Sequence, residues 1–316
     1  MTFFWQQLKK PIIGLAPMDG ITDPPFRAVV DEIGKPSVLY TEFISADGFV
    51  RNPARLSHTL ITHSSSTPLV AQLFGANPDS MYEAATLLLK FPIQGIDINM
   101  GCPNKHVAKT NGGASLIQYP KLAQILIRTV KRAIKDSGKN IGISVKTRIG
   151  YDKPDTREWI STLLEEGPDA IALHGRTFRQ MFQGQANWEE IKIASGLASQ
   201  TKTLLLGNGD AKSYKDAIDK SQNYSPDGVL IGRAALGNPW VFTDTVPDKS
   251  MKIQAALKHI EFFNKLTPTA DVLSLRKHLC WYMKGFPDSS EIRKKLVSIH
   301  TTSEAKEILL SSVDKP

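Results

Sequence analysis

The segment most informative about the fold is Gly95-Ile96-Asp97-Ile98-Asn99, which runs directly into Met100-Gly101-Cys102-Pro103. It is a short apolar run that ends in a polar residue and a glycine turn, which is typical of a buried parallel strand. Seven more runs of this kind occur, so the predicted strands cover residues 12–15, 38–42, 68–73, 95–99, 141–146, 170–173, 203–206 and 228–231. Amphipathic segments separate these runs, which indicates an α/β fold.

Three of the intervening segments carry helix signals. Asn77-Pro78-Asp79 places a proline near the first helical position, and Asp155-Thr156-Arg157-Glu158 has the pattern of a capping box. Residues 119–137 have the apolar spacing of a long helix. Eight such strand and helix units predict a (β/α)₈ TIM barrel. A doubly wound Rossmann-like sheet is the alternative, but no G-x-G-x-x-G turn follows the first strand.

The pattern changes after the eighth unit. Residues 1–244 are expected to form the barrel, Thr245-Val246-Pro247-Asp248 a linker, and residues 250–316 a small all-helical domain with apolar residues at helical spacing. This last part holds 11 Lys and Arg against 7 Asp and Glu, a net charge of +4.

Composition limits the classes of protein and partner. The 316 residues are 41% hydrophobic, which suffices for one large core. No apolar run reaches the roughly 20 residues of a membrane-spanning helix, and no signal peptide is evident, so we expect a cytoplasmic monomer. The net charge of +8 favours an anionic partner, although solubility alone would also explain it. The two cysteines have neither disulfide nor metal spacing, so no metal is expected.

The residues at or just after the ends of the predicted strands, most of them polar, are the candidate active site, because barrel enzymes work at the C-terminal mouth of the strands. They are Ala16, Pro17 and Met18, then Gln72, Asn99, Lys146, Arg148, His174, Arg176, Asn208, Gly209, Asp210, Gly232 and Arg233. Their convergence on one mouth is the functional prediction, and it weighs more than any one residue.

Glycine-rich turns after the seventh and eighth strands predict a phosphate site, although they are also compatible with plain tight turns. Lys146 in the mouth suits a flavin, since a nearby cation stabilises its reduced ring; the alternative is a lysine facing solvent. Gln72 and His174 are suitable hydrogen-bond donors to the same ring.

Cys102 is the candidate catalytic side chain, because loops at a barrel mouth often contain the catalytic residues. A neutral thiol can donate a proton, and the only histidine in its loop is His106, so a general acid is favoured over a protease-like nucleophile or a buried filler. Cys280, in an apolar helical segment, is expected in the core.

These motifs closely resemble the tRNA-dihydrouridine synthase family. The resemblance covers Ala16-Pro17-Met18, Asp97 to Pro103, Lys146-Thr147-Arg148, Leu173 to Thr177, Gly207 to Asp210, Ile231 to Ala235, and a tail with Arg276-Lys277-His278 followed by Trp281-Tyr282, as in a bacterial branch. It spans nearly the whole chain in order, which makes it specific.

The resemblance implies that FMN, reduced by NADPH or NADH, delivers hydride from N5 to C6 of a uridine in tRNA, while Cys102 protonates C5. The implied FMN contacts are Ala16, Pro17, Met18, Gln72, Lys146, His174, Asn208, Gly209, Asp210, Gly232 and Arg233, and Asn99 lies near the uracil. Arg148 and Arg176 at the rim, with Arg276, Lys277 and His278 in the helical domain, are the expected RNA contacts.

Three alternatives of other kinds stay open. An FMN barrel acting on a free pyrimidine or enone would share the phosphate site and Lys146, but it gives no reason for the basic tail. A tRNA-binding protein without turnover would not need Cys102. An isomerase of phosphorylated sugars would bind no flavin.

Overall fold

A computed structural model of the chain describes residues 4–104, 107 and 112–313. Its centre is a sheet of eight parallel strands in the order β1-β8-β7-β6-β5-β4-β3-β2. The strands are β1 Ile12–Leu15, β2 Leu39–Ser45, β3 Leu69–Phe74, β4 Gly95–Met100, β5 Gly142–Arg148, β6 Ala170–His174, β7 Leu204–Asn208 and β8 Gly228–Ile231.

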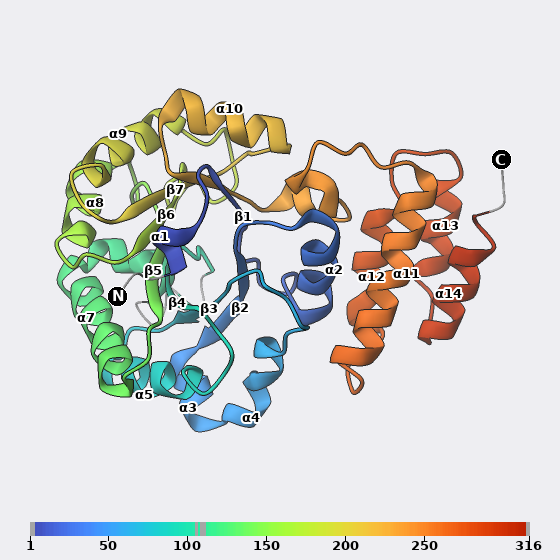
Figure 1. Cartoon of the computed structure of the whole chain (residues 1–316), viewed down its shortest axis with the longest axis horizontal. Coiled ribbons are helices and arrows are strands. Elements are labelled where there is room, and N and C mark those ends of the chain that lie inside the picture. Colours follow the sequence, from blue (N-terminus) through green and yellow to red (C-terminus); the bar gives the residue numbers. More distant parts are fainter. Residues whose placement is uncertain (1–3, 105–106, 108–111, 314–316) are drawn as a thin grey trace.

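The sheet closes on itself between its first and last members. The Leu15 N–H donates to the Val38 carbonyl at 3.0 Å, and the Ser37 N–H donates to the Ile13 carbonyl at 2.8 Å. These bonds connect β1 to the start of β2, so the predicted barrel is confirmed (Figure 1).

All eight predicted strands are present, and six of them run one to three residues further at their C-terminal ends. The reason is that backbone pairing continues past the apolar run. Arg148 on β5 still pairs with His174 on β6, which in turn pairs with Asn208 on β7. The strand ends therefore carry polar side chains into the mouth at the same level.

Helices surround the barrel, as Figure 1 shows. The main ones are α2 Pro24–Gly34, α5 Pro78–Leu88, α7 Pro120–Ser137, α8 Thr156–Leu164, α9 Trp188–Ala198 and α10 Tyr214–Tyr224, with the short α1 Phe4–Gln7, α3 Ala46–Arg51 and α4 Pro53–Leu56. The predicted helix start at Asn77-Pro78-Asp79 is confirmed: Pro78 is the first residue of α5, and the Asn77 side chain caps the helix by accepting from the Asp79 and Ser80 N–H groups.

The predicted capping box before α8 is wrong. The side chain of Asp155 makes no capping bond. Instead, the Asp155 N–H donates to the Ile149 carbonyl at 2.8 Å, and the Thr156 hydroxyl donates to the same oxygen at 3.4 Å. The segment is therefore anchored to the end of β5, and this tertiary contact replaces the local cap.

Two apolar layers hold the barrel together. Side chains such as Tyr40, Val70, Leu206 and Leu230 fill its interior, and Trp5 from α1 belongs to the same cluster. A larger cluster lies between the strands and the surrounding helices. The N-terminal half of the barrel is thus packed solid, so that open space is left at the opposite end.

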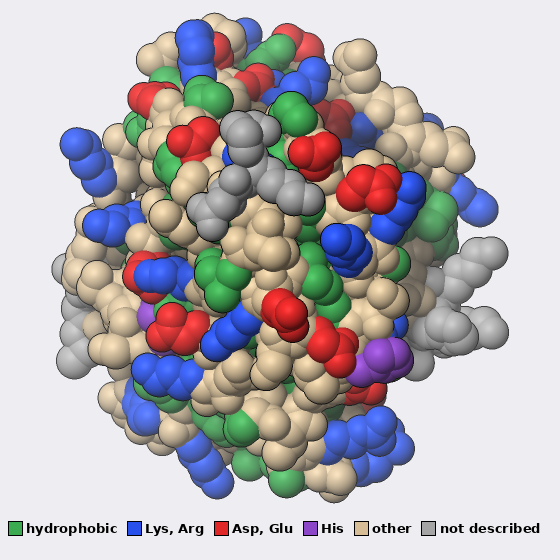
Figure 2. All heavy atoms as spheres, turned by 90° about the vertical axis from the view of Figure 1, so that its right-hand side faces the viewer, with side chains coloured by type: hydrophobic (Ala, Val, Ile, Leu, Met, Phe, Trp, Pro, Cys, Tyr) green, Lys and Arg blue, Asp and Glu red, His purple; other side chains and the backbone are tan. Residues whose placement is uncertain are grey.

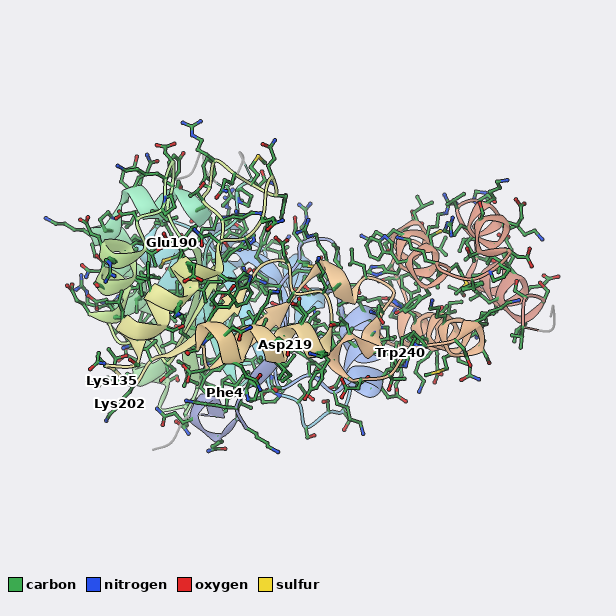
Figure 3. The ribbon with its side chains drawn as sticks, turned by 90° about the horizontal axis from the view of Figure 1, so that it is seen from above. Phe4, Lys135, Glu190, Lys202, Asp219 and Trp240 are labelled. Carbon is green, nitrogen blue, oxygen red and sulfur yellow. The ribbon has the colours of Figure 1, made fainter. Side chains whose placement is uncertain are left out.

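The chain after the barrel is helical. A 3₁₀ turn, Pro239–Phe242, leads through residues 243–248 to α11 Lys249–Leu266, α12 Leu273–Tyr282, α13 Ser289–Leu296 and α14 Thr302–Leu310. These helices have a core of their own, which also includes Val29 of α2 and Trp240. Figure 3 places Trp240 where the two parts meet. Among the described residues, no helix has both the length and the apolarity to cross a bilayer.

Candidate active site

A cavity of about 850 Å³ opens at the C-terminal mouth of the barrel. All eleven residues predicted to bind a cofactor line it: Ala16, Pro17, Met18, Gln72, Lys146, His174, Asn208, Gly209, Asp210, Gly232 and Arg233. Cys102, Asn99 and Arg148 line it as well. The predicted strand ends therefore converge on one space, which is large enough for a nucleotide-sized ligand.

Lys146 is a partly buried cation of this cavity. Its Nζ donates to the Asn208 side-chain oxygen at 3.1 Å, and the Asn208 amide donates to the Leu230 carbonyl at 2.8 Å. Burial and the neighbouring Arg148 lower the pKa of Lys146 to about 8. A bound anion would relieve this penalty, so the site favours an anionic ligand.

His174 lies at the end of β6 with its ring against the other cations. Burial, and then the charges of Lys146, Arg148 and Arg176, lower the pKa of His174 well below its usual value. The imidazole is therefore neutral at physiological pH. It can donate one hydrogen bond and accept another, and it adds no further positive charge.

The turn after β7 has an uncommon backbone. Gly209 has a φ of 121°, and Asp210 has a φ of 53°. A Cβ on Gly209 would lie 2.6 Å from the Ala186 Cβ and 2.9 Å from the His174 Cδ2, so only glycine fits. This turn and Gly232 after β8 both border the cavity, in the region where barrels commonly bind phosphate.

Asp210 organises the charges beside that turn. Its carboxylate accepts from Arg176 at 2.6 Å, from Arg233 at 2.9 Å and from the Ala186 N–H at 2.9 Å. Burial alone would raise the pKa of Asp210, but these donors lower it below the usual value. The ionised Asp210 thus holds both guanidinium groups near the cavity wall.

Cys102 is half-buried beside Asn99. The Asn99 side-chain oxygen accepts from the N–H groups of Gly101 and Cys102, at 3.0 and 2.8 Å. Burial is the main reason that the pKa of Cys102 is raised, so the thiol keeps its proton at neutral pH. His106, the histidine of the same loop, lies outside the described residues.

Two of the expected RNA contacts sit deeper than predicted. Arg148 lines the cavity, but its side chain is 2% exposed and donates to the carbonyls of Gly101, Thr177 and Met181. Arg176 is also 2% exposed, and it donates to the Gln183 and Gly184 carbonyls as well as to Asp210. Both were predicted at the rim as RNA contacts; their guanidinium groups hold backbone of the mouth loops in place, and contact with RNA stays a prediction.

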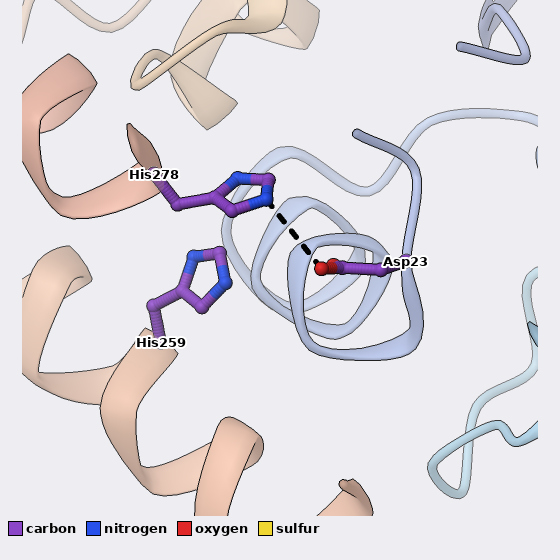
Figure 4. A group of neighbouring side chains, drawn as sticks. All are labelled: Asp23, His259 and His278. Carbon is purple, nitrogen blue, oxygen red and sulfur yellow. Dashed lines mark ion pairs between the residues drawn. The ribbon is translucent and has the colours of Figure 1, made fainter. Parts of the chain in front are cut away.

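The three helical-domain candidates differ from one another. Lys277 is exposed and donates to the Gly20 carbonyl at the barrel mouth, while Arg276 donates from Nε to the Ile299 carbonyl at 2.9 Å. His278 is only 1% exposed, and its Nε2 lies 3.4 Å from the Asp23 carboxylate (Figure 4). The prediction that His278 contacts RNA is therefore corrected, since it lies at the junction of barrel and helices.

His259 joins this buried pair, and the three ligand atoms lie within 4.8 Å of one another. Ligands about 2.1 Å from a zinc ion are no more than about 4.2 Å apart, so the spacing is looser than a zinc site requires. The His259 Nδ1 is instead 3.0 Å from the Tyr282 hydroxyl. The group is better described as a polar contact between the two parts of the chain.

Several residues of the site were not predicted. Phe43, Asp19 and Lys212 line the cavity. Phe182 also lines it and is 58% exposed, with the guanidinium carbons of Arg233 and Arg148 at 5.6 and 5.9 Å from its ring centre. The aromatic residue at the end of the Phe178-to-Phe182 loop was the one feature of the sequence that pointed to Phe182. Its position at the cavity depends on how the loop folds, which the sequence does not give.

Comparison with known proteins gives the family. A probable tRNA-dihydrouridine synthase of Staphylococcus aureus (strain COL) is 32% identical over 315 residues, covering 97% of this chain and 94% of that protein. Probable tRNA-dihydrouridine synthase 1 of Synechocystis sp. is 31% identical over 308 residues, covering 93% and 84%. Morphinone reductase in complex with tetrahydroNAD shares the fold, with a TM-score of 0.50 at 10% identity over 80% of this chain and 93% of that one. The family profile described as dihydrouridine synthase (Dus) matches residues 14–315, so the chain belongs to the dihydrouridine synthase family of oxidoreductases.

Proposed function

We propose that this protein is a tRNA-dihydrouridine synthase that uses FMN and NADPH or NADH to reduce the C5=C6 bond of a uridine in tRNA. The family and the names of its relatives support the reaction class. The observation that carries the finer proposal is the arrangement of the cavity, where a partly buried cation, a neutral histidine and a protonated thiol border one space.

The chemistry of the donor set fits FMN. The Lys146 ammonium and the Gln72 amide suit the polar edge of an isoalloxazine, and Ala16, Pro17 and Met18 offer an apolar wall. The Gly209 and Gly232 turns, with Arg233 beside them, suit a phosphate. When bound, FMN supplies the hydride that reduces C6.

Cys102 supplies the proton in this proposal. Its Sγ–H bond breaks as the C5–H bond forms, so that hydride and proton together saturate the double bond. The thiolate left behind takes a proton from solvent. Asn99 holds the Cys102 backbone, and Arg148, which donates to the Gly101 carbonyl at 2.7 Å, holds the same loop from the other side.

The uridine must leave its stack to reach the cavity, at a cost of a few kcal/mol. Phe182, which is exposed at the mouth, offers a surface on which a base can stack. Contacts between phosphates and exposed cations contribute the rest of the affinity, and Arg276 and Lys277 are the proposed contacts from residues 250–316. Figure 2 shows that Lys and Arg are interspersed with Asp and Glu on the helical end. The proposed contacts with phosphates therefore come from individual basic side chains and not from a continuous basic surface.

Replacing Cys102 tests the proposed role of the thiol. Cys102→Ala should retain bound FMN and NADPH oxidation and lose about 10²–10⁴-fold in the rate of uridine reduction, the usual worth of a general acid. The measurement is stopped-flow flavin absorbance with tRNA as oxidant. Loss of flavin binding in the variant would show that Cys102 is structural.

The identity of the substrate needs a separate test, since a free pyrimidine could enter the same cavity. Dihydrouridine should disappear from at least one tRNA position in a strain lacking the gene, and return with the wild-type copy. Unchanged dihydrouridine at every position, together with a purified protein that binds no flavin, would refute the proposal. Unchanged dihydrouridine with a flavin-loaded protein would favour the free-pyrimidine reaction.

A further inference from the structure

A row of hydrogen-bonded side chains crosses three neighbouring strands beneath Cys102. In the strand register, Asp97 on β4 is level with Gln72 on β3 and with Ser144 on β5. All three are fully buried. The Gln72 Nε2 donates to one oxygen of Asp97 at 2.7 Å, and the Ser144 hydroxyl donates to the other at 2.5 Å. Both oxygens of this carboxylate are therefore engaged from the adjacent strands.

The direction of the row follows from the chemistry of Asp97. An ionised carboxylate only accepts hydrogen bonds, so Gln72 must turn its NH₂ group toward Asp97 and its oxygen away. That oxygen accepts from the Asn99 NH₂ group at 2.8 Å. The Asn99 oxygen is then left facing the loop, where it accepts from the N–H groups of Gly101 and Cys102.

We propose that Asp97 is a positioning residue, which fixes the orientation of the Gln72 and Asn99 amides and, through Asn99, the backbone of Cys102. Asp97 does not line the cavity described above, so it acts through these side chains. An isolated amide has no preferred orientation, and an acceptor oxygen at the start of the row selects this one. The catalytic meaning of the inference rests on the proposed function, but the contacts belong to the chain without any ligand.

The decisive test measures the reactivity of Cys102 without FMN or tRNA. In a Cys280→Ser background Cys102 is the remaining cysteine, because the chain has two. Asp97→Val removes the acceptor and keeps a similar volume in the strand. Iodoacetamide should then alkylate Cys102 about tenfold faster, and its apparent pKa should fall toward the ordinary value as the loop loosens.

Two matched variants separate orientation from charge and packing. Asp97→Asn still offers Gln72 an acceptor oxygen, so alkylation should stay within about twofold of the parent. Ser144→Ala removes one bond to Asp97 but no link of the row, and it should also stay within about twofold. Alkylation of Asp97→Val at the parental rate would overturn the proposal, as would equal acceleration in Asp97→Asn or in Ser144→Ala.

The same variants are then assayed as FMN-loaded enzymes. Asp97→Val should lower kcat for uridine reduction about 10- to 100-fold with little change in the KM for tRNA, since a misplaced donor slows the step without weakening RNA binding. Should circular dichroism show that Asp97→Val is unfolded, Gln72→Leu breaks the row at its middle, and unchanged alkylation there overturns the proposal. Faster alkylation of Asp97→Val, found together with an FMN-loaded parent protein that reduces no uridine in tRNA, would instead support the positioning role and refute the proposed function.

Discussion

Lys146 illustrates how burial sets the preference of this cavity for a ligand. Its ammonium is enclosed beside Arg148, and the pKa of Lys146 falls from 10.5 to about 8 as a result. Holding a charged lysine there without a counter-charge costs folding free energy at neutral pH. An anionic ligand offsets that cost, which makes the charge part of the binding site as well as a chemical group.

The affinity of the apoprotein for FMN should therefore depend on pH. Binding an anion favours the charged lysine and raises its pKa again, so affinity is greatest below pH 8 and weakens as pH rises through the unliganded pKa. Titration by flavin fluorescence from about pH 6.5 to about 9.5 should show a decline of up to about tenfold per pH unit above pH 8. Lys146→Met should bind weakly with no such decline. A flat profile in the wild type would mean that Lys146 does not face the ligand.

At the scale of elements, the turn after β7 connects backbone geometry to ligand binding. Gly209 stands where its φ of 121° and the nearby Ala186 exclude a side chain. Arg176 and Arg233 meet at Asp210 in the same turn. The end of β7 pairs with β6, and the turn at Gly209 can be made only by glycine. Together they place two guanidinium groups beside the region proposed for phosphate.

Gly209→Ala should destabilise the protein by about 1–3 kcal/mol and weaken FMN binding, because the turn must shift away from the cavity. Gly138→Ala is the matched control. Gly138 also has a positive φ, 69°, but it lies outside the site, and a Cβ added there would have no other atom within 4 Å. This substitution should cost about 1 kcal/mol and leave the FMN Kd unchanged. Urea unfolding and flavin titration distinguish the two, and equal effects of both variants on Kd would contradict a specific role for the turn.

At the scale of the whole molecule, the barrel and the helices meet around Asp23. One oxygen of Asp23 caps α2 by accepting from the Phe26 N–H at 2.9 Å, and the other faces His278 of α12. Lys258 of α11 pairs with Glu32 of α2, and Lys277 reaches Gly20. These contacts connect the helical segment to the loop that borders the cavity, so under the proposed function they set the orientation of the tRNA.

Asp23→Ala should lower the free energy of unfolding by about 1–3 kcal/mol at neutral pH, since it removes a helix cap and the partner of His278. Burial alone would raise the pKa of Asp23, but His278 and His259 lower it below 3.8. Its stabilisation is therefore present above the unfolded pKa and is lost as pH falls through the folded value. Urea titrations at several pH values should show the difference from wild type shrinking in acid. Asp23→Asn, which can keep the cap, should lose less, and a pH-independent difference would contradict the ion pair.

The sequence was enough to predict the barrel and eleven of the residues that line its cavity. Each buried strand is a local run of Ile, Val and Leu, and the segments at the ends of these runs carry polar residues of the mouth, such as Lys146 and Asn208. The helical tail was also evident, because apolar spacing is a local property.

Which polar groups meet depends on the tertiary structure. Arg176 and His278 were predicted to contact RNA, yet both are buried. Their partners come from other segments: Arg176 donates to the Gln183 and Gly184 carbonyls and to Asp210, and His278 faces the Asp23 carboxylate. Asp155 has the pattern of a cap, but the carbonyl at the end of β5 takes its N–H. The row from Asp97 to Cys102 likewise needs the register of three strands. The hydropathy of each side chain is a property of that residue alone, so the pattern of buried strands and helices can be predicted from the sequence. A hydrogen bond needs a donor and an acceptor, which here come from distant segments that only folding brings together.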